Sequence, residues 1–328
     1  MLQKVNKQLE RFMPLITPVA VILGVLLSTH IKGFSFLIPW IFAFMTFSGS
    51  LNSNFKSLKE AVTHPFPVFI TLFVLHIFMP LWAWGFGHVI FNGDAYTITG
   101  FILGMVIPTG ITSFIWVSMY KGHSTLTLAI ILIDTLLSPA IVPYSLHLLV
   151  GKAVEIHPSS IMVGLLQMIV VPSLMAMAIN QLTKGRVKET ISPKLAPFSK
   201  LGLGIVVMLN GSVVAPYLRN INLKLLSIAL VVFVIALSGY FVAFLIGRVF
   251  KQQKSTVIAI TYTGGMRNIS AGAVLAVSYF PAPVVVPVVI GMLFQQVLAS
   301  LYGLFLSKFY ASKARLEQPT QYYNEKVK

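Results

Sequence analysis

The chain has 328 residues, of which 56% are hydrophobic and 10% are charged, and its mean hydropathy is +0.86. Soluble domains carry about 25% charged residues, so this composition predicts a polytopic membrane protein. The absence of cysteine excludes disulfide bonds and thiolate metal sites. A net charge of +16 would suggest a nucleic-acid partner in a soluble protein, but the positions of the charges indicate otherwise.

Ten apolar segments follow one another along the chain, each near the ~20 residues that a helix needs to cross a bilayer. We therefore predict an all-α membrane protein with ten transmembrane helices. The predicted helices span residues 13–29, 35–53, 66–90, 97–120, 124–150, 158–183, 198–218, 223–249, 255–279 and 282–311.

Basic residues are distributed unequally between the two sides that ten spans would create. Of the 24 lysines and arginines, Arg267 lies within a span, 19 lie on the side of the termini, and the other four are Lys32, Lys152, Arg219 and Lys224. Cytoplasmic loops carry such an excess, so we predict a multi-pass protein of the cytoplasmic membrane with both termini in the cytoplasm. The excess then reports topology and implies no nucleic-acid partner, and the basic stretch at 184–200 is interpreted as a solvated loop.

The loop pattern divides the ten helices into two halves of five. We predict a first repeat at 1–153, a second repeat at 154–312, and a polar cytoplasmic tail at 313–328 whose composition is typical of a disordered segment. Because five is odd, a duplicated second half would insert upside down relative to the first. Inverted repeats of this kind are common in secondary transporters.

A polar stretch interrupts the fourth helix of each half. Residues 107–113 read Ile-Pro-Thr-Gly-Ile-Thr-Ser, and residues 262–268 read Tyr-Thr-Gly-Gly-Met-Arg-Asn. Proline and paired glycines weaken a helix, while hydroxyl and amide groups offer oxygen atoms. A kink would explain either stretch alone, but two at equivalent places predict discontinuous helices that line a transport site. The candidate site residues here are Pro108, Thr109, Gly110, Thr112, Ser113, Thr263, Gly264, Met266, Arg267 and Asn268.

Three pairs of motifs carry a resemblance to a known family. They are Phe47 to Leu51 followed by His64-Pro65, Pro108 to Ser113 followed by Leu136 to Pro139, and Gly265 to Asn268 followed by Pro281 to Val285. Their order and spacing resemble the bile acid:sodium symporter family. The resemblance implies a panel of helices 1, 2, 6 and 7, a core of helices 3–5 and 8–10, and crossed breaks in helices 4 and 9. It also implies sodium-driven uptake of an organic anion that binds beside the crossing.

The resemblance extends only partly to the sodium ligands. Family members usually carry Glu, Gln, Asn and a hydroxyl residue where this chain has Thr263, Arg267, Phe114 and Ile131, respectively. The positions that fit the family pattern are Ser113, Thr127 and the backbone near Gly264 and Met266. Sodium prefers a shell of oxygens with some negative charge, and a guanidinium in the same site would repel it. We expect no cofactor, and proton-coupled or cation-independent transport stands beside sodium symport as an interpretation.

Two charged residues, Asp134 and Arg267, lie in the interior of predicted spans, away from the span ends. A charge at the bilayer centre costs roughly 2.5–3.5 kcal/mol on insertion scales, so such a residue indicates a functional site. Arg267 could replace a sodium ion, bind a substrate carboxylate, or pair with Asp134, which lies seven residues after Thr127 on nearly the same helix face. Asp134 could also carry a proton. These interpretations overlap and stay open.

Four further polar residues inside spans are weaker candidates. They are His76, Asn210, Gln295 and Gln296. His76 could titrate near neutral pH or simply hydrogen-bond a neighbour. The three amides could line a cavity or join helices through hydrogen bonds.

We expect a secondary transporter that moves a small organic anion, such as a bile acid, a pantoate-like acid or a keto acid, across the lipid bilayer. A passive organic-anion channel or uniporter is the alternative. An intramembrane enzyme is disfavoured because the spans contain no paired aspartates, no nucleophile with its base and no metal cluster. The sequence leaves the oligomeric state open, and a monomer is compatible with it.

Overall fold

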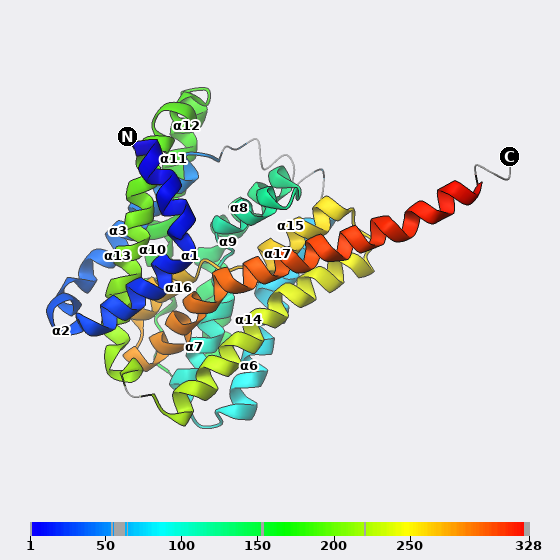
Figure 1. Cartoon of the computed structure of the whole chain (residues 1–328). Coiled ribbons are helices and arrows are strands. Elements are labelled where there is room, and N and C mark those ends of the chain that lie inside the picture. The colour runs from blue at the N-terminus through cyan, green and yellow to red at the C-terminus, as the bar shows by residue number, and fades with distance from the viewer. Residues whose placement is uncertain are drawn as a thin grey trace.

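The computed structural model describes residues 2–53, 55, 63, 65–151, 154–219 and 221–324. Within this part the chain is almost entirely helical, with short connections and no β-strand (Figure 1). His64, Lys152 and the end of the chain from residue 325 lie outside the described residues. The helices are α1 (Leu2–Leu26), α2 (Ser28–Ile31), η1 (Lys32–Leu37), α3 (Ile38–Ser50), α5 (Pro65–Phe73), η2 (Val74–Phe78), α6 (Met79–Ile90), α7 (Ala95–Val106), α8 (Thr112–Met119), α9 (Ser124–Val150), α10 (Pro158–Leu165), η3 (Leu166–Val170), α11 (Val171–Leu182), α12 (Arg186–Thr190), α13 (Ser192–Leu218), α14 (Leu223–Val249), α15 (Lys254–Gly265), α16 (Ile269–Tyr279) and α17 (Ala282–Asn324).

In the described part of the chain, seven helices are long and apolar enough to cross a membrane. They are Ser28–Ser50, Pro65–Ile90, Ser124–Val150, Pro158–Leu182, Ser192–Leu218, Leu223–Val249 and Ala282–Ala311. The other three segments predicted to span are α1, which is apolar only from Leu15 to Leu26, and the interrupted pairs α7/α8 and α15/α16. These lengths and compositions are those of a multi-pass membrane protein.

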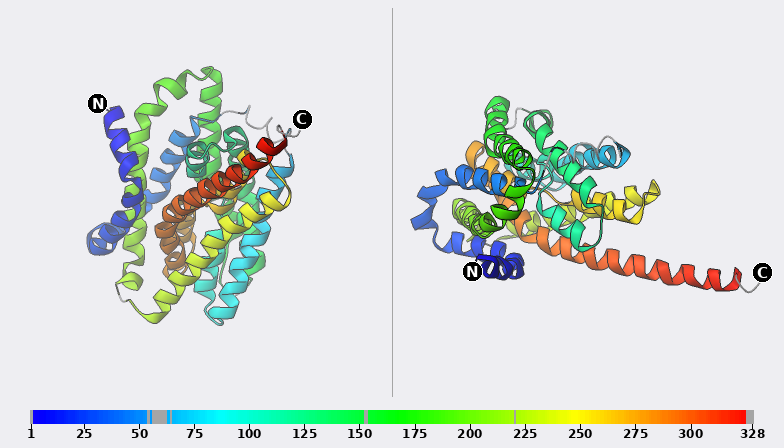
Figure 2. Two further views of the ribbon diagram at one scale, coloured as in Figure 1. Left: turned by 45° about the vertical axis from the view of Figure 1, so that its right-hand side comes forward. Right: turned by 90° about the horizontal axis from the view of Figure 1, so that it is seen from above.

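The helices form two packed groups. One contains α1, α3, α11 and α13, and the other contains α6, α7, α9, α14, α15 and α17 (Figure 2). Glycine permits the closest approach in the first group, because a Cβ atom on Gly24 of α1 would lie 2.1 Å from the carbonyl oxygen of Met208 in α13. Small residues let helix backbones approach in this way within a membrane. Contacts of α13 with α16 and α17, and of α3 with α16, join the two groups.

Both interruptions that the sequence predicts are present. α7 ends at Val106, Ile107 is extended with φ −63° and ψ 148°, and α8 begins at Thr112. α15 ends at Gly265, Met266 is extended with φ −90° and ψ 144°, and α16 begins at Ile269. Proline at 108 favours an extended conformation in the residue before it, which explains the position of the first break.

Two prolines widen helices rather than break them. The π-helical segments η2 and η3 each end two residues before a proline, Pro80 and Pro172. A proline removes one backbone donor and clashes with the carbonyl four residues earlier, and a π turn accommodates both effects. In η2 this turn contains His76, so the sequence places a titratable side chain on an irregular turn.

The last helix continues into the segment that the sequence assigned to a polar tail. α17 continues from Ala282 to Asn324, well past the apolar segment that ends near residue 311. Extending an existing helix adds one hydrogen bond per residue and avoids the cost of nucleation, and the residues after 312 include Lys, Ala, Arg, Leu and Glu, which favour helix. The two ends of the described chain lie toward the same end of the molecule as α12 (Figure 2).

Candidate functional site

The two helix breaks lie against each other at the centre of the molecule. The backbone N–H of Asn268 donates a hydrogen bond of 2.8 Å to the carbonyl oxygen of Pro108. A Cβ atom on Gly110 would lie 3.2 Å from the carbonyl oxygen of Arg267, so glycine allows the two backbones to pass closely at this point. Segments about 160 residues apart in the sequence are therefore joined through their backbones.

Each second half-helix is anchored at its start by a polar side chain. Asn268 caps α16 by accepting a hydrogen bond from the backbone N–H of Ala271 at 3.3 Å. Ser113, in the first turn of α8, donates its hydroxyl to the carbonyl oxygen of Gly110 at 2.8 Å. The unpaired N–H groups at a helix N-terminus carry partial positive charge, so both breaks present positive ends.

Arg267 binds the opposite ends of the half-helices. Its side chain is 2% exposed. Nε donates to the carbonyl oxygen of Met105 at 3.1 Å, and Nη1 donates to those of Gly264 at 2.8 Å and Met266 at 3.3 Å. These carbonyls lie at the C-terminal ends of α7 and α15, where the helix dipoles place partial negative charge. The guanidinium thus neutralises two helix ends at once, and Gln295 Oε1 accepts the Arg267 backbone N–H at 3.0 Å.

Asp134, fully buried in α9, has a different set of partners. One carboxylate oxygen lies 2.5 Å from Nε2 of His76, and the other accepts the backbone N–H of Thr109 at 2.6 Å. The pair of Asp134 with Arg267, one of the interpretations that the sequence left open, is not formed among the described residues, where the side-chain partner of Asp134 is His76. Helix-end carbonyls hold the guanidinium, and the Thr109 amide holds the carboxylate, so the two charges interact only at longer range.

Three polar atoms near this crossing have unused hydrogen-bonding capacity. Nδ1 of His76, Oγ1 of Thr109 and Nη2 of Arg267 are buried, and none has a partner among the residues that the structure describes. Buried polar atoms of this kind cost about 1–3 kcal/mol each and are rare in folded proteins. Their gathering around one point marks the crossing as a site that can accept further protons or polar groups.

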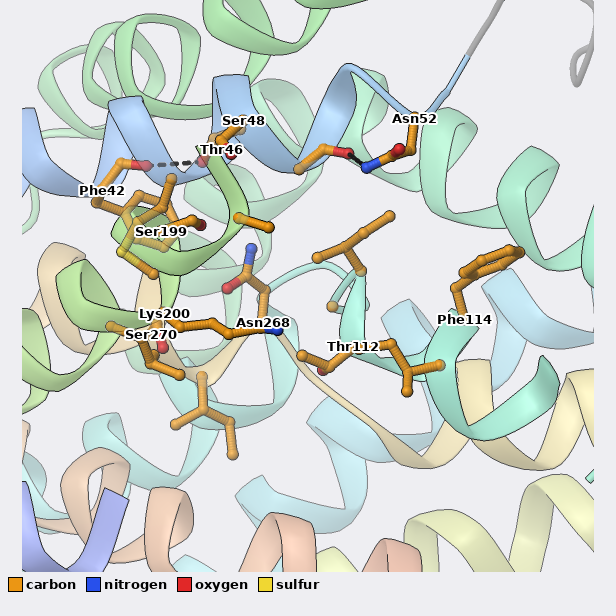
Figure 3. Close-up of a pocket in the computed structure, with 18 of the residues that line it drawn as sticks. Phe42, Thr46, Ser48, Asn52, Thr112, Phe114, Ser199, Lys200, Asn268 and Ser270 are labelled. Atoms are coloured by element: carbon orange, nitrogen blue, oxygen red, sulfur yellow. Dashed lines mark hydrogen bonds between the residues drawn. The ribbon is translucent and has the colours of Figure 1, made fainter. Parts of the chain in front are cut away.

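A cavity of about 480 Å³ lies beside the crossing, between the two helix groups. Figure 3 shows Asn268 between the side chains of α3 and α13 and those of α8. Of the predicted site residues, those that line the cavity are Gly110, Thr112, Arg267, Asn268, Gln295 and Gln296, together with Phe114. Those that lie outside its lining are Pro108, Thr109, Ser113, Thr127, Asp134, Thr263, Gly264, Met266, His76 and Asn210.

The hydroxyls that fit the family pattern, those of Ser113 and Thr127, donate to the carbonyl oxygens of Gly110 at 2.8 Å and His123 at 3.0 Å. At the positions that depart from the pattern, Thr263 donates to the carbonyl oxygen of Ala259 at 2.8 Å and Ile131 has no oxygen on its side chain. The carbonyls of Gly264 and Met266 accept from Arg267, so these residues bring a guanidinium and no carboxylate, which differs from the oxygen shell with negative charge that sodium prefers.

Among the residues that the structure describes, the charged side chains that line the cavity are all cationic: Lys188, Lys200 and Arg267. Lys200 of α13 also donates to Oδ1 of Asn6 at 2.5 Å. The sequence interpretation missed both lysines because it assigned the basic stretch 184–200 to a solvated loop. In the structure Lys188 lies in α12, and the helix that carries Lys200, α13, begins at Ser192 rather than at the predicted residue 198. Pro193 at the start of this helix is the signal that could have moved the boundary, since proline is favoured in the first turn.

The remaining amide candidates differ in their roles. Gln296 Oε1 accepts the indole N–H of Trp116 at 3.1 Å, so it joins α17 to α8 while lining the cavity. Asn210 is fully buried in α13, and its amide has no partner in the described part of the chain. The hydrogen bond between helices that was an alternative for Asn210 is therefore not formed among these residues.

Comparisons with known proteins agree with the resemblance seen in the motifs. A family model described as the sodium bile acid symporter family matches residues 39–221. YbaS of Bacillus subtilis, an uncharacterized protein, is 56% identical over 297 residues, which cover 90% of this chain and 97% of YbaS. YocS of the same organism, named an uncharacterized sodium-dependent transporter, is 27% identical over 297 residues, 88% of this chain and 90% of YocS. BASS1 of Oryza sativa subsp. japonica, named a probable sodium/metabolite cotransporter, is 26% identical over 256 residues, 78% of this chain and 61% of BASS1. The chain belongs to the sodium bile acid symporter family, a family of membrane transporters.

Proposed function

We propose that this chain carries a small organic anion across the cytoplasmic membrane as a secondary transporter. In this proposal the ten predicted spans form two inverted five-helix repeats. The first helix group, α1, α3, α11 and α13, acts as a panel, and the second group moves against it as the core. The family membership, the separate packing of the two groups, and the crossing of the two breaks support this arrangement.

The charge of the cavity is the observation that carries the proposal. Lys188, Lys200 and Arg267 line it, and within the described residues no aspartate or glutamate does. The half-helices α8 and α16 begin beside it, which adds the partial positive charge of two N-termini. Its volume of about 480 Å³ falls in the range of about 300–1,000 Å³ typical of small-molecule sites. A carboxylate is attracted to such a site.

The lining of the cavity supports an inward-facing conformation. It extends to Lys188 of α12 and Ser192 at the start of α13, at the end of the molecule where both chain ends lie (Figure 2). If that end is cytoplasmic, as the excess of basic residues predicts, the anion binding site is open to the cytoplasm. Alternating access would then close this side and open the cavity on the other.

We further propose that Arg267 supplies the positive charge that sodium supplies in the family. The support is its position, since the guanidinium binds the helix-end carbonyls of Gly264 and Met266. A sodium ion about 4 Å from the guanidinium would be repelled by about 4 kcal/mol at an effective dielectric constant of 20. That energy corresponds to roughly a thousandfold loss of sodium affinity. Transport by this chain would therefore not require sodium.

Uptake by the purified protein in liposomes tests the proposed function. The panel comprises radiolabelled potassium salts of a bile acid, pantoate and a 2-keto acid. We expect saturable uptake of at least one acid, inhibited by an excess of the unlabelled acid. A flux that rises linearly with concentration would indicate the channel alternative, and the absence of flux above that of protein-free liposomes for every acid would contradict transport of organic anions.

A further inference from the structure

We propose that His76 and Asp134 together form the proton-binding site of this transporter, so that one proton crosses the membrane with each organic anion. The inference rests on the proposed function, which it deepens by naming the coupling ion and the residues that hold it. The pair is buried, joins three elements of the core, and contains an unused proton acceptor.

The hydrogen bonds around the pair identify where a proton would bind. The Asp134 carboxylate accepts the Thr109 backbone N–H at 2.6 Å and lies 2.5 Å from Nε2 of His76. An ionised carboxylate only accepts hydrogen bonds, so beside an ionised Asp134 the Nε2 atom of His76 carries a hydrogen whether the ring is neutral or charged, and the neutral ring has its free lone pair on Nδ1. Nδ1 then holds the free lone pair, and it is the atom that has no partner among the described residues. A proton binds at Nδ1, giving an imidazolium beside the carboxylate, and leaves from the same atom.

The charge balance links this proton to an anionic substrate. With His76 neutral, the negative charge of Asp134 balances the positive charge of Arg267. A proton on His76 gives the crossing a net charge of +1, which a carboxylate in the adjacent cavity neutralises. Bringing both together avoids an uncompensated charge in the membrane interior. The proton therefore favours binding of the anion, and the anion favours binding of the proton by the same factor.

The pair is also mechanically connected to the cavity. Asp134 lies on α9, His76 on the π-helical segment η2, and Thr109 in the break between α7 and α8. Gly110, the next residue after Thr109, lines the cavity. A change in the charge of the pair alters the strength with which Asp134 holds the Thr109 amide. It can thus bias the position of the break that carries the cavity wall.

Few other ionisable groups in the described part of the chain face the pair. Arg267, from the break after α15, attracts Asp134 at longer range. Tyr262 of α15 and Tyr240 of α14 donate their hydroxyls elsewhere, to the carbonyl oxygens of Ala299 at 3.1 Å and Gln295 at 3.3 Å. The other ionisable residues on or next to the elements around the pair lie toward helix ends, namely His88, Asp94, Tyr96, Tyr120, Lys121, His123, Tyr144, His147, His157, Lys224, Arg248, Lys251 and Lys254. His76 is thus the histidine placed to exchange a proton at the crossing.

The test compares gradient-driven uptake with exchange at equilibrium, using the acid that the liposome panel identifies. In sodium-free buffer, a proton gradient of one pH unit, alkaline inside, should raise the accumulation of the acid about tenfold over the value without a gradient, as expected for one proton per anion. Protein-free liposomes correct for passive entry of the protonated acid. Asp134→Asn and His76→Gln should abolish this gain, and exchange of internal for external acid reports whether each variant still binds the acid.

Matched controls come from the same chain. Asp94→Asn changes the other aspartate, which caps α7 at the membrane surface, and His88→Gln changes an exposed histidine on α6. Both should keep the tenfold gain. Saturable uptake by wild type with no response to the proton gradient would overturn the proton site and leave organic-anion transport intact. A full tenfold gain in both Asp134→Asn and His76→Gln would also overturn it.

Protonation of His76 can also be measured without a substrate, which keeps the proposal testable if a variant no longer exchanges the acid. In purified protein labelled on histidine with ¹³C and ¹⁵N, the NMR signals of His76 are assigned by their loss in His76→Gln. The proposed proton binding predicts a reversible change in the Nδ1 shift of His76 as the pH is varied. Asp134→Asn should move the midpoint. A His76 signal that does not change between pH 5 and 9 would overturn the proposal.

Discussion

Arg267 holds the ends of two half-helices, and its replacement by glutamine tests that role. Arg267→Gln removes three charge-assisted hydrogen bonds, to the carbonyl oxygens of Met105, Gly264 and Met266. The shorter amide can reach about one of these acceptors, so two buried carbonyls would be left without a partner. At about 1–3 kcal/mol for each such group, the loss of stability is about 2–6 kcal/mol.

The assay is thermal unfolding of purified protein in detergent, followed by the fluorescence of its four tryptophans. At roughly 2 °C per kcal/mol for a large chain, the expected fall in Tm is roughly 4–12 °C. Arg219→Gln is the matched control, because Arg219 also donates to a helix carbonyl, that of Val25 at 3.0 Å, but at an exposed position. We expect this control to change Tm by about 2 °C or less, since exposed polar contacts contribute about 0–1 kcal/mol.

Equal Tm values for Arg267→Gln and Arg219→Gln would refute this reasoning. Such a result would mean that the guanidinium contributes no more than an exposed arginine. Arg267→Lys provides a second point, because lysine keeps the charge but loses the planar geometry that reaches several carbonyls. Its Tm should lie between those of wild type and Arg267→Gln.

Three further predictions concern other parts of the molecule. Gly24→Ala places a Cβ atom 2.1 Å from the Met208 carbonyl oxygen, so we expect the free energy of unfolding to fall by about 1–3 kcal/mol. The control Gly33→Ala, whose Cβ atom would have no atom within 4 Å, should leave the free energy of unfolding unchanged. Equal effects of the two substitutions would contradict the close packing of α1 on α13. Lys200→Met removes about 1 kcal/mol of electrostatic attraction for an anion, which should raise the KM for uptake about fivefold with little change in kcat. The control Lys308→Met changes a lysine outside the cavity lining and should leave KM unchanged. Burial raises the pKa of Asp94, but hydrogen bonds from Lys224 and Thr97 outweigh this and lower the pKa below its ordinary value. The ionised carboxylate of Asp94 therefore stabilises the fold above its ordinary pKa, and this stabilisation is lost as the pH falls through the lowered pKa of the folded state. The Tm difference between wild type and Asp94→Asn should be present at pH 6 and shrink at about pH 3. A Tm difference that does not change with pH would contradict this prediction.

The breaks could be predicted from sequence because their causes are local. Pro108 restricts the residue before it, and glycines at 110, 264 and 265 remove the side chains that would hinder close approach of backbones. The resemblance then supplied the expectation that the two breaks cross, and the hydrogen bond between Asn268 and Pro108 agrees with that.

The partners of the buried charges could not be predicted in the same way. Asp134 and Arg267 are the two charges that lie away from the ends of the predicted spans, so a direct pair was one of the interpretations that the sequence left open. The observed partner, His76, lies on a π turn, which changes the direction of the side chain relative to a regular α-helix. Pro80 indicates an irregular turn in the sequence, but its effect on the direction of His76 depends on how α5, α6 and α9 pack.

The cationic lining of the cavity also depends on tertiary packing. Lys188 and Lys200 belong to a basic stretch whose charge pattern indicates topology, and nothing in that pattern says which lysine faces a cavity. The position of Lys200 results from the packing of α13 against α3 and α1, and that of Lys188 from the packing of α12 against α13 and α11. The sequence therefore indicated the class of substrate mainly through family resemblance, whereas the structure provides an electrostatic reason for it.

The most direct test of the account is the initial rate of organic-anion uptake by wild-type protein in liposomes, measured while sodium chloride is replaced stepwise by potassium chloride at constant ionic strength. Arg267 bound to the carbonyls of Gly264 and Met266 predicts the same saturable rate at every sodium concentration, including zero. A rate that rises with sodium along a saturating curve and vanishes in potassium alone would contradict the claim that this guanidinium takes the place of the coupling ion.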